Sequence, residues 1–220
     1  MRVIAGTYRS RQLLAPRGAA TRPTSDRLRE TRFNILAPRV AGCRFADLYA
    51  GTGAVGIEAL SRGAAHVWFA ERAEPALAAI RANLKALKIG HGFTVEERGT
   101  GALLERLASA TQKAGSAAQI VQPGGTEGAQ STRPGELLDL VYLDPPWEAE
   151  AEYTNTLHLL GSAWGRPILA PGALVVAEHN SKAQLAPRFG ELAQTRTLKQ
   201  GDAALSFYAV SAALQHTDLD

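Results

Sequence analysis

At 220 residues with 45% hydrophobic composition, the chain is long enough to bury one substantial core and too short for two domains of typical size. Its single cysteine, Cys43, excludes a disulfide framework and a cysteine metal site, and it predicts a reducing compartment. No apolar run reaches membrane-spanning length, and the first residues lack the apolar core of a signal peptide. We therefore expect a cytoplasmic monomer with no membrane partner.

Positive charge is concentrated at the start of the chain. The net charge is +3, yet residues 1–44 hold ten arginines against Asp26 and Glu30, which gives this segment +8 and leaves −5 for the remainder. Arginine binds phosphate through paired N–H groups and stacks on bases, so the segment predicts a nucleic-acid partner. The alternative is an ordinary solvated surface. The arginines are Arg2, Arg9, Arg11, Arg17, Arg22, Arg27, Arg29, Arg32, Arg39 and Arg44.

Residues 1–20 are expected to form a basic β-hairpin extension of the main domain, which we expect over residues 21–215. Two short β-type runs flank Gly6-Thr7-Tyr8-Arg9. This pattern places Arg9 and Arg11 at the tip of the hairpin, where we expect them to contact phosphates.

A helix is predicted after the extension. Thr24 or Ser25 caps it, and it reaches Leu36 before Pro38 stops it. Arg22 lies just before the cap, so contact with a phosphate and contact with a cofactor carboxylate both remain open. The helix leaves three arginines for solvent or ligand, Arg27, Arg29 and Arg32. Of these, Arg27 is a further expected phosphate contact.

A strand over residues 44–50 is followed by a glycine turn, Gly51-Thr52-Gly53-Ala54-Val55-Gly56, and by a helix that ends at Arg62. Such glycines let the backbone approach a ligand and direct helix N–H groups at it. Glu71, twenty residues after Gly51, also fits a dinucleotide site. However, Asp47 at the end of the strand would repel a pyrophosphate, and it favours a cofactor with positive charge. Glu71 follows a strand over residues 66–70 and is placed to accept two ribose hydroxyls.

The next elements are a core helix, a third strand and an insertion. Pro75 lies in the first turn of a helix that Gly90 closes. A strand over residues 93–98 leads to Gly99-Thr100-Gly101 and to a helix over residues 102–109. Residues 111–135 are rich in Gly, Gln, Ser and Thr without periodicity, so we expect a flexible insertion there. The core stripe of the first helix consists of Leu77, Ile80, Leu84 and Leu87.

The segment Leu137–Trp147, LLDLVYLDPPW, predicts a buried parallel strand that delivers Asp144 to the edge of the sheet where ligands bind. The two prolines have no N–H, so the loop presents acceptors. The Asp144 carboxylate and the Pro145 carbonyl can each accept one hydrogen of a planar amino group, and Trp147 offers a ring for stacking. Asp144, Pro145, Pro146 and Trp147 are therefore the expected catalytic residues. The alternative is a proline-rich turn that merely ends a strand.

The remaining chain predicts one more helix, with Tyr153, Leu157, Leu160 and Trp164 on its apolar stripe, then a strand over 173–178 and a final pair over 191–199 and 203–211. Five strands that alternate with helices, followed by a strand pair, indicate an α/β fold with a doubly wound, mostly parallel seven-stranded sheet and a reversed edge. The five histidines are scattered without metal-ligand spacing, so we expect no metal.

Several of these motifs resemble a known family. DLYAGTGAVG, FAER and DLVYLDPPW resemble the Rossmann-like fold of class I S-adenosylmethionine-dependent methyltransferases, with the Asp-Pro-Pro-aromatic loop of enzymes that methylate amino groups. RVIAGTYRSRQLLAP and RPTSDRLRETRFNIL resemble the bacterial family that methylates the N2 amine of guanine in 16S ribosomal RNA. The resemblance covers nearly the whole chain except residues 111–135 and the last few residues.

The resemblance implies a role for most of the motif residues. Asp47, Gly51 and Gly53 would line the methionine end of S-adenosylmethionine, and Glu71 would hold its ribose. The Gly99-Thr100 turn would lie by the adenine, where related enzymes often have an acid, and the loop Asp144–Trp147 would hold the guanine. The other expected cofactor contacts are Tyr49, Arg72, Arg22 and Thr24.

Four functions remain open. The first is a methyltransferase that acts on 16S ribosomal RNA or the small ribosomal particle, by direct displacement without a metal or covalent intermediate, after the base leaves its stack. The second is a DNA adenine-N6 methyltransferase with the same loop, although the chain has no length for a separate recognition domain. The others are a non-enzymatic RNA-binding protein and a nicotinamide oxidoreductase. We favour the first, because Asp47, Glu71 and the Asp-Pro-Pro-Trp loop occur together.

Overall fold

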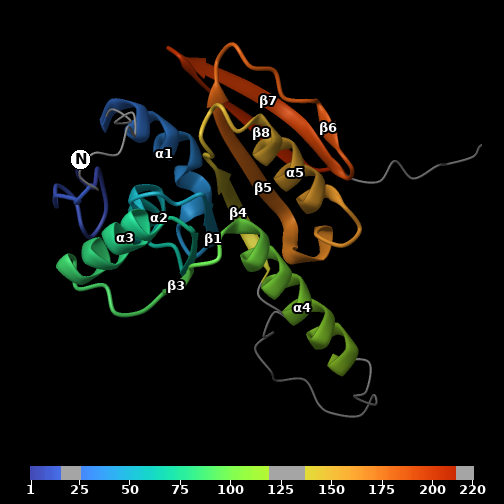
Figure 1. Ribbon diagram of the computed structural model, residues 1–220, viewed down its shortest axis with the longest axis horizontal. Coiled ribbons are helices and arrows are strands. Elements are labelled where there is room, and N and C mark those ends of the chain that lie inside the picture. The colour runs from blue at the N-terminus through green and yellow to red at the C-terminus, as the bar shows by residue number, and fades with distance from the viewer. Residues whose placement is uncertain (16–25, 119–136, 212–220) are drawn as a thin grey trace, which may run out of the picture.

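The computed structural model describes residues 1–15, 26–118 and 137–211 (Figure 1). Its helices alternate with strands, as the apolar patterns predict. In chain order the elements are α1 (Asp26–Val40), β1 (Arg44–Leu48), α2 (Ala54–Ser61), β2 (His66–Ala70), α3 (Glu74–Ala86), β3 (Phe93–Glu96), α4 (Thr100–Ala118), β4 (Leu138–Leu143), α5 (Glu150–Gly161), the 3-10 helix η1 (Arg166–Ile168), β5 (Leu169–Asn180), β6 (Arg188–Phe189), β7 (Leu192–Gln200) and β8 (Ala203–Val210).

All strands named above belong to one sheet, in the order β3-β2-β1-β4-β5-β8-β7-β6. The first five strands run parallel, and β8, β7 and β6 pair antiparallel at one end. The predicted fold class is confirmed. The described part of the chain has eight strands rather than the expected seven, because the two-residue strand β6 adds a short pairing that apolar periodicity does not reveal.

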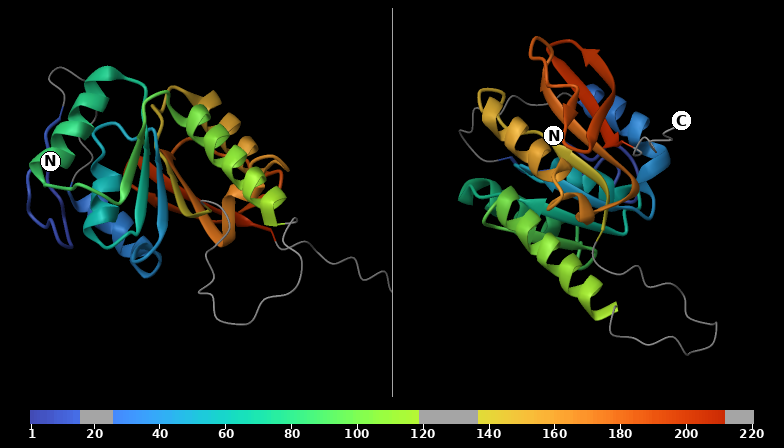
Figure 2. Two further views of the ribbon diagram at one scale, coloured as in Figure 1. Left: turned by 90° about the horizontal axis from the view of Figure 1, so that it is seen from below. Right: turned by 90° about the vertical axis from the view of Figure 1, so that its right-hand side faces the viewer.

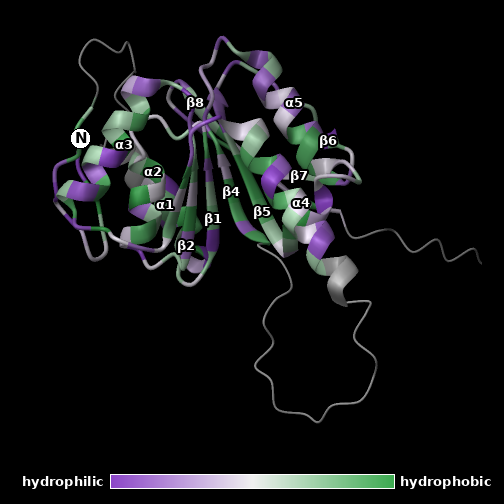
Figure 3. Ribbon diagram, turned by 60° about the horizontal axis from the view of Figure 1, so that its bottom comes forward, coloured by the Kyte–Doolittle hydropathy of each residue, from purple (hydrophilic) through white to green (hydrophobic). Residues whose placement is uncertain are grey.

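Helices cover both faces of the sheet (Figure 2). On one face α1, α2 and α3 pack on a buried cluster that includes Phe33, Phe69 and Ile80. On the other, α4 and α5 pack on a cluster that includes Leu104 and Leu157. Figure 3 shows the hydrophobic central strands enclosed between these helices. The central strands β1, β2 and β4 therefore present both of their faces to a core, which explains their nearly unbroken apolar sequences.

Three elements extend beyond their expected bounds. Helix α1 does not stop before Pro38 but continues to Val40, because Val40 is 1% exposed and its packing outweighs the one hydrogen bond that a proline removes. Helix α4 runs to Ala118, so residues 111–118 are helical, and the rest of the expected insertion lies almost entirely outside the described residues. Strand β5 begins at Leu169 and passes Gly172 in the left-handed region, at φ 75°.

The core helix α3 carries its predicted stripe, since Leu77, Ile80, Leu84 and Leu87 are all buried. It ends at Ala86 rather than at Gly90, and Lys88 takes the left-handed conformation that we expected of a glycine.

The N-terminal segment folds back on itself through an isolated antiparallel bridge between Arg2 and Gln12, where we expected two hairpin strands. It is fixed to α2. The Glu58 carboxylate, which is 0% exposed, accepts hydrogen bonds from the N–H groups of Ile4 at 2.7 Å and Ala5 at 3.0 Å. At Gly6 a Cβ would lie 1.8 Å from the Ser61 carbonyl oxygen, so only glycine allows this close approach.

The strand order and the faces on which the helices lie determine where the site is. Strands β1 and β4 are neighbours, but α2 after β1 lies on one face and α5 after β4 lies on the other. The chain thus leaves the sheet in opposite directions at this point, which opens a crevice beyond the carboxyl ends of the two strands. In the described part of the chain, no helix is long and apolar enough to cross a membrane.

Candidate active site

A cavity of about 1210 Å³ lies in this crevice. That volume exceeds the range of a typical small-ligand site, so it accommodates a nucleoside-sized cofactor together with part of a second molecule. Most of the predicted site residues border it. They are Tyr49, Gly51, Glu71, Arg72, Gly99, Thr100, Asp144, Pro145, Pro146 and Trp147.

The glycine turn after β1 has the backbone geometry that its sequence predicts. Gly51 and Gly53 have φ values of 54° and 75°, in the left-handed region that favours glycine. Gly53 caps α2, and a Cβ there would lie 3.1 Å from Ile80 and 3.4 Å from Phe69. Gly53 therefore supports the turn from below and does not itself border the cavity. Tyr49 has φ 66°, an unfavourable conformation for an aromatic residue that marks a constrained position.

Asp47 lies beneath the glycine turn rather than on the cavity wall. Its carboxylate is 1% exposed and accepts a 2.8 Å hydrogen bond from the Gly56 N–H in the first turn of α2. Burial raises the pKa of Asp47 to about 7, although the bond from Gly56 opposes the shift. The spacing between Asp47 and the glycine turn fits a carboxylate that faces a ligand and also one that caps the next helix. In this structure the Asp47 carboxylate caps the helix.

Glu71 borders the cavity with both of its carboxylate oxygens occupied. One oxygen accepts from the Gly51 N–H at 2.8 Å, and the other accepts from the N–H groups of Arg72 at 2.7 Å and Ala73 at 2.9 Å. A carboxylate has about four acceptor positions, so little capacity remains for two ribose hydroxyls. Glu71 would have to release a backbone N–H to hold both hydroxyls of a ribose.

The turn after β3 supplies the far wall. Gly99 has φ 86°, and Thr100, which begins α4, is 9% exposed. The two acids just before the turn, Glu96 and Glu97, do not border the cavity. Glu96 forms ion pairs with Arg98 at 3.0 Å and Arg106 at 3.6 Å, and Glu97 pairs with Arg81. Related enzymes often have an acid by the adenine, where this chain has Thr100. Neither Glu96 nor Glu97 therefore takes the place of that acid.

A side-chain network spans the cavity between the glycine turn and α5. The Tyr49 hydroxyl donates a 2.8 Å hydrogen bond to Glu152 and lies 2.8 Å from the Thr156 hydroxyl. Arg72 reaches Glu152 from the opposite side, at 3.8 Å. Burial raises the pKa of Tyr49 to about 12, so this hydroxyl stays protonated. Our sequence interpretation missed Glu152 and Thr156, which look like polar residues on an exposed helix face.

The Asp-Pro-Pro-Trp loop is held from behind by a tyrosine. The buried Tyr153 hydroxyl lies 3.1 Å from the Pro145 carbonyl oxygen and 2.8 Å from the Glu178 carbonyl oxygen, so both carbonyls share its single hydrogen. These bonds fix the loop to β5. Since a carbonyl oxygen has two lone pairs, Pro145 retains one for a ligand. Sequence periodicity placed Tyr153 on the core face of its helix but did not reveal this polar role.

A buried charge cluster lies behind Asp144. Arg32 and Glu178, which are 2% and 3% exposed, form an ion pair, and the Tyr142 hydroxyl donates to the other oxygen of Glu178. Arg32 is thus not on the solvated side of its helix, as we expected, because it bonds to a residue 146 positions away. Burial and the Glu178 carboxylate raise the pKa of Asp144 well above its ordinary value, while Arg32 opposes this shift.

The predicted phosphate contacts are distributed differently from the prediction. Arg9 and Arg11 are exposed, but the Thr7 N–H donates to the Ser61 carbonyl at 2.8 Å, at the end of α2 remote from the glycine turn. Arg11 also donates to the Ala86 carbonyl at 3.3 Å. The side chain of Arg27 and all of Arg22 and Thr24 lie outside the described residues.

The described residues contain no group of three or more His, Cys, Asp or Glu side chains that could hold a metal ion. Cys43 is buried and free. Burial, together with Asp139, raises the pKa of its thiol to about 12, so it stays protonated and unreactive.

Comparison with known proteins agrees with this fold. The family model described as "Conserved hypothetical protein 95" matches residues 1–123 and 96–209. "Putative rRNA methyltransferase YlbH" of Bacillus subtilis is 32% identical over 94% of this chain and 98% of its own length. "Ribosomal RNA small subunit methyltransferase D" of Haemophilus influenzae is 28% identical over 90% of this chain and 88% of its own length.

A solved structure also has a similar fold. "Putative methyltransferase yhhF from Escherichia coli" superposes with a TM-score of 0.71 at 28% identity, and the match covers 96% of this chain and 98% of that one. The chain therefore belongs to the Conserved hypothetical protein 95 family and shares the fold of these methyltransferases.

Proposed function

We propose that the protein transfers a methyl group from S-adenosylmethionine to the exocyclic N2 amine of a guanine in 16S ribosomal RNA. The observation that carries the proposal is that the Asp-Pro-Pro-Trp loop after β4 and the glycine turn after β1 border one cavity at the carboxyl edge of the sheet. The names of the relatives in Bacillus subtilis and Haemophilus influenzae support ribosomal RNA as the substrate class.

The residues around the cavity suit this cofactor, which when bound supplies a methyl group on a positively charged sulfur. Carboxylates of Glu71, Asp144, Glu152 and Glu178 border the cavity, and such a set attracts a cation and repels a pyrophosphate. Glu71 would bind the ribose, and the turn at Gly99 would lie against the adenine. This charge balance disfavours a nicotinamide dinucleotide.

The loop after β4 would hold the target amine. The lone pair of an exocyclic amine is delocalised into the ring, so the amine is a poor nucleophile. When the Asp144 carboxylate and the Pro145 carbonyl each accept one of its hydrogens, the nitrogen becomes pyramidal and its lone pair points at the methyl group. Trp147 would stack on the flipped base. The methylated nitrogen must then lose a proton, and the raised pKa of Asp144 makes its carboxylate a competent acceptor.

We further propose that the enzyme is a cytoplasmic monomer that acts on 16S ribosomal RNA, free or in the small-subunit particle, during assembly or maturation. An adenine-N6 methyltransferase would use the same two acceptors, so the identity of the base must be measured. A non-enzymatic RNA-binding protein would have no use for a cavity of this size between two ligand-type loops.

The test is methyl transfer from labelled S-adenosylmethionine to 16S ribosomal RNA and small-subunit particles from a strain that lacks this protein. We expect label on guanine N2 at one position, with transfer by Asp144→Asn reduced about 10²-fold or more. Label on adenine N6 would overturn the guanine assignment. A parent protein that binds the cofactor but labels no RNA would overturn the substrate class.

A further inference from the structure

One strand beside the proposed base site is left uncovered. Residues 195–199 of β7 are all exposed. Successive strand side chains point to opposite faces, so five exposed residues in a row mean that neither face is covered here. Strand β6 pairs with Leu192 and Ala193, and the Gln194 N–H donates to the Pro187 carbonyl at 2.8 Å. From Thr195 onward, β7 is a free edge within residues 1–15, 26–118 and 137–211.

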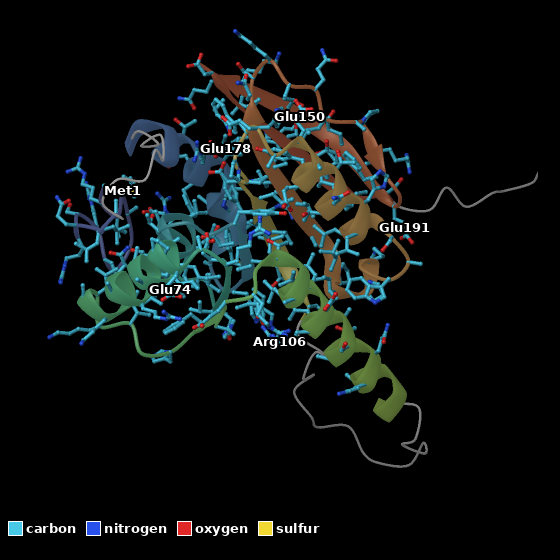
Figure 4. The ribbon with its side chains drawn as sticks, in the orientation of Figure 1. Met1, Glu74, Arg106, Glu150, Glu178 and Glu191 are labelled. Atoms are coloured by element: carbon cyan, nitrogen blue, oxygen red, sulfur yellow. The ribbon has the colours of Figure 1, made fainter. Side chains whose placement is uncertain are left out.

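The tip of this strand reaches the cavity. Gln200, Asp202 and Ala203 of the β7–β8 turn border it. Gln200 donates a 3.4 Å hydrogen bond to Thr31 on α1, and the Ser181 N–H after β5 donates to the Asp202 carbonyl at 2.8 Å. The turn thus lies between α1 and the end of β5, at the Glu178 end of the cavity (Figure 4).

Arg196 and Lys199 lie on β7 and Lys182 follows the end of β5, and we call these three cations the β7 basic rim. Arg196 lies opposite Phe207, with its guanidinium 4.3 Å from the ring centre. Lys199 lies opposite Ala204, which in turn pairs with His179 on β5. All three are exposed, and none forms an ion pair within the described part of the chain.

The register places Arg196 and Lys199 on opposite faces of the sheet. Arg196 shares the sheet face of Phe207 and Val176, which is also the face of Glu178, whereas Lys199 projects from the opposite face. Lys182 follows Asn180 in the turn at the end of β5, where the Asn180 side chain accepts its N–H at 2.9 Å. Asp202 is the one acid in the turn from Gln200 to Ala203.

Arg9 and Arg11 lie away from this position. The backbone around Thr7 is bound at the Ser61 end of α2, and an eight-residue helix separates that end from the glycine turn by about 12 Å. Contacts at Arg9 could fix RNA along the side of the molecule. They cannot hold the phosphates next to a base inserted between Asp144 and Trp147.

We propose that the β7 basic rim binds the phosphates that flank the target nucleotide. The inference rests on the proposed function, because it takes the RNA and its flipped base as given. Phosphate contacts set the position of a nucleic acid without reading its sequence, and cations on both sides of a strand tip suit a backbone that bends around a flipped base.

The competing explanation is protection of an exposed edge. Charged residues and a bulge, such as the register shift between Gln194 and Arg196, prevent edge strands from pairing with other molecules. That role predicts self-association when the charge is removed, and no change in RNA binding. The proposed role predicts the opposite, so one set of variants separates the two.

The experiment compares Lys182→Ala/Lys199→Ala with Lys113→Ala/Arg188→Ala, a control pair that also removes two exposed cations, one near the far end of α4 and one at β6. Binding to a 16S ribosomal RNA fragment that contains the mapped target is measured from low to moderate salt. We expect the rim variant to lower the log–log slope by roughly two, because each lost phosphate contact lowers it by about one. We expect the control pair to keep the parent slope, and both variants to keep the parent affinity for S-adenosylmethionine.

The outcomes are distinguishable. If the parent methylates RNA and the rim variant binds RNA like the control, the rim proposal is overturned while the proposed function stands. If light scattering shows that the rim variant self-associates with an unchanged slope, edge protection is the correct role. If the parent neither binds nor methylates RNA, the proposed function itself fails. Thr197→Lys, which adds a cation to the same exposed stretch, should steepen the slope by about one if the rim proposal is correct.

Discussion

Replacing Arg32 by leucine should destabilise the protein strongly, and the cost should depend on pH. Arg32 is 2% exposed and Glu178 is 3% exposed, so the substitution leaves a buried carboxylate with Tyr142 as its remaining side-chain partner. Removing one member of a buried ion pair costs about 3–5 kcal/mol, a large share of the roughly 5–15 kcal/mol that stabilises a typical domain. Urea unfolding at pH 8, followed by circular dichroism, measures the loss.

The pH dependence follows from the sign of the Glu178 shift. Burial already raises the pKa of Glu178 above its ordinary value, although Arg32 and Tyr142 oppose the shift. Without Arg32 the folded-state pKa rises further. A carboxyl group whose pKa is raised on folding contributes stability below its unfolded pKa of about 4.3 and loses it as the pH rises through the folded value. The deficit of Arg32→Leu should therefore be small near pH 4–5 and full at pH 8.

Two further variants control this reasoning. Arg39→Leu changes an exposed arginine on the same helix, bonded only to the Gly172 carbonyl at 2.8 Å, and should cost about 1 kcal/mol or less. Arg32→Leu/Glu178→Gln removes the unpaired charge while the amide oxygen can still accept from Tyr142, so it should recover most of the lost stability. If Arg32→Leu were as stable at pH 8 as Arg39→Leu, the buried pair would not have the energetic role that its burial implies.

Further predictions concern the cavity. Asp144→Asn should keep cofactor affinity in calorimetry but lose about 10²-fold or more in methyl transfer, and the activity of the parent should fall as the pH drops through the raised pKa of Asp144. Tyr153→Phe should lower kcat more than it raises KM, since it frees the Pro145 carbonyl, and it should cost about 1 kcal/mol in urea unfolding. Gly53→Val should abolish S-adenosylmethionine binding in calorimetry, because its φ of 75° and the contact with Ile80 exclude a side chain. Arg9→Ala/Arg11→Ala should lower the salt slope of RNA binding by roughly one to two with cofactor affinity unchanged, and an unchanged slope would place the RNA elsewhere.

The fold was largely predictable because its signals are local. Buried parallel strands appear in the sequence as short apolar runs. The turn after β1 has left-handed backbone conformations that favour glycine, so its glycines predict it. The bounds that failed depend on tertiary packing. Helix α1 passes Pro38 because Val40 fits the core, which no pattern within the helix encodes.

The candidate site was predictable where a residue follows a strand and less so where its role depends on distant partners. Glu71 and Asp144 border the cavity because they come directly after parallel strands, whose carboxyl ends share one edge. Asp47 lies within the last residues of β1, and its carboxylate turns under the glycine loop to Gly56. Position along the chain thus determines the edge at which a side chain lies, and not the direction in which it points.

The distribution of charge illustrates the same distinction for RNA binding. Counting arginines identified residues 1–44 as the basic part of the chain, and this count remains correct. In the folded protein, however, Arg32 neutralises Glu178, and the turn before Arg9 is bound at the end of α2 remote from the cavity. Lys182 and Lys199 lie outside this basic segment, yet the antiparallel pairing of β5, β8 and β7 brings both near the turn that borders the cavity. A charge acts through its place in the fold, so the RNA path must be traced over the surface rather than along the sequence.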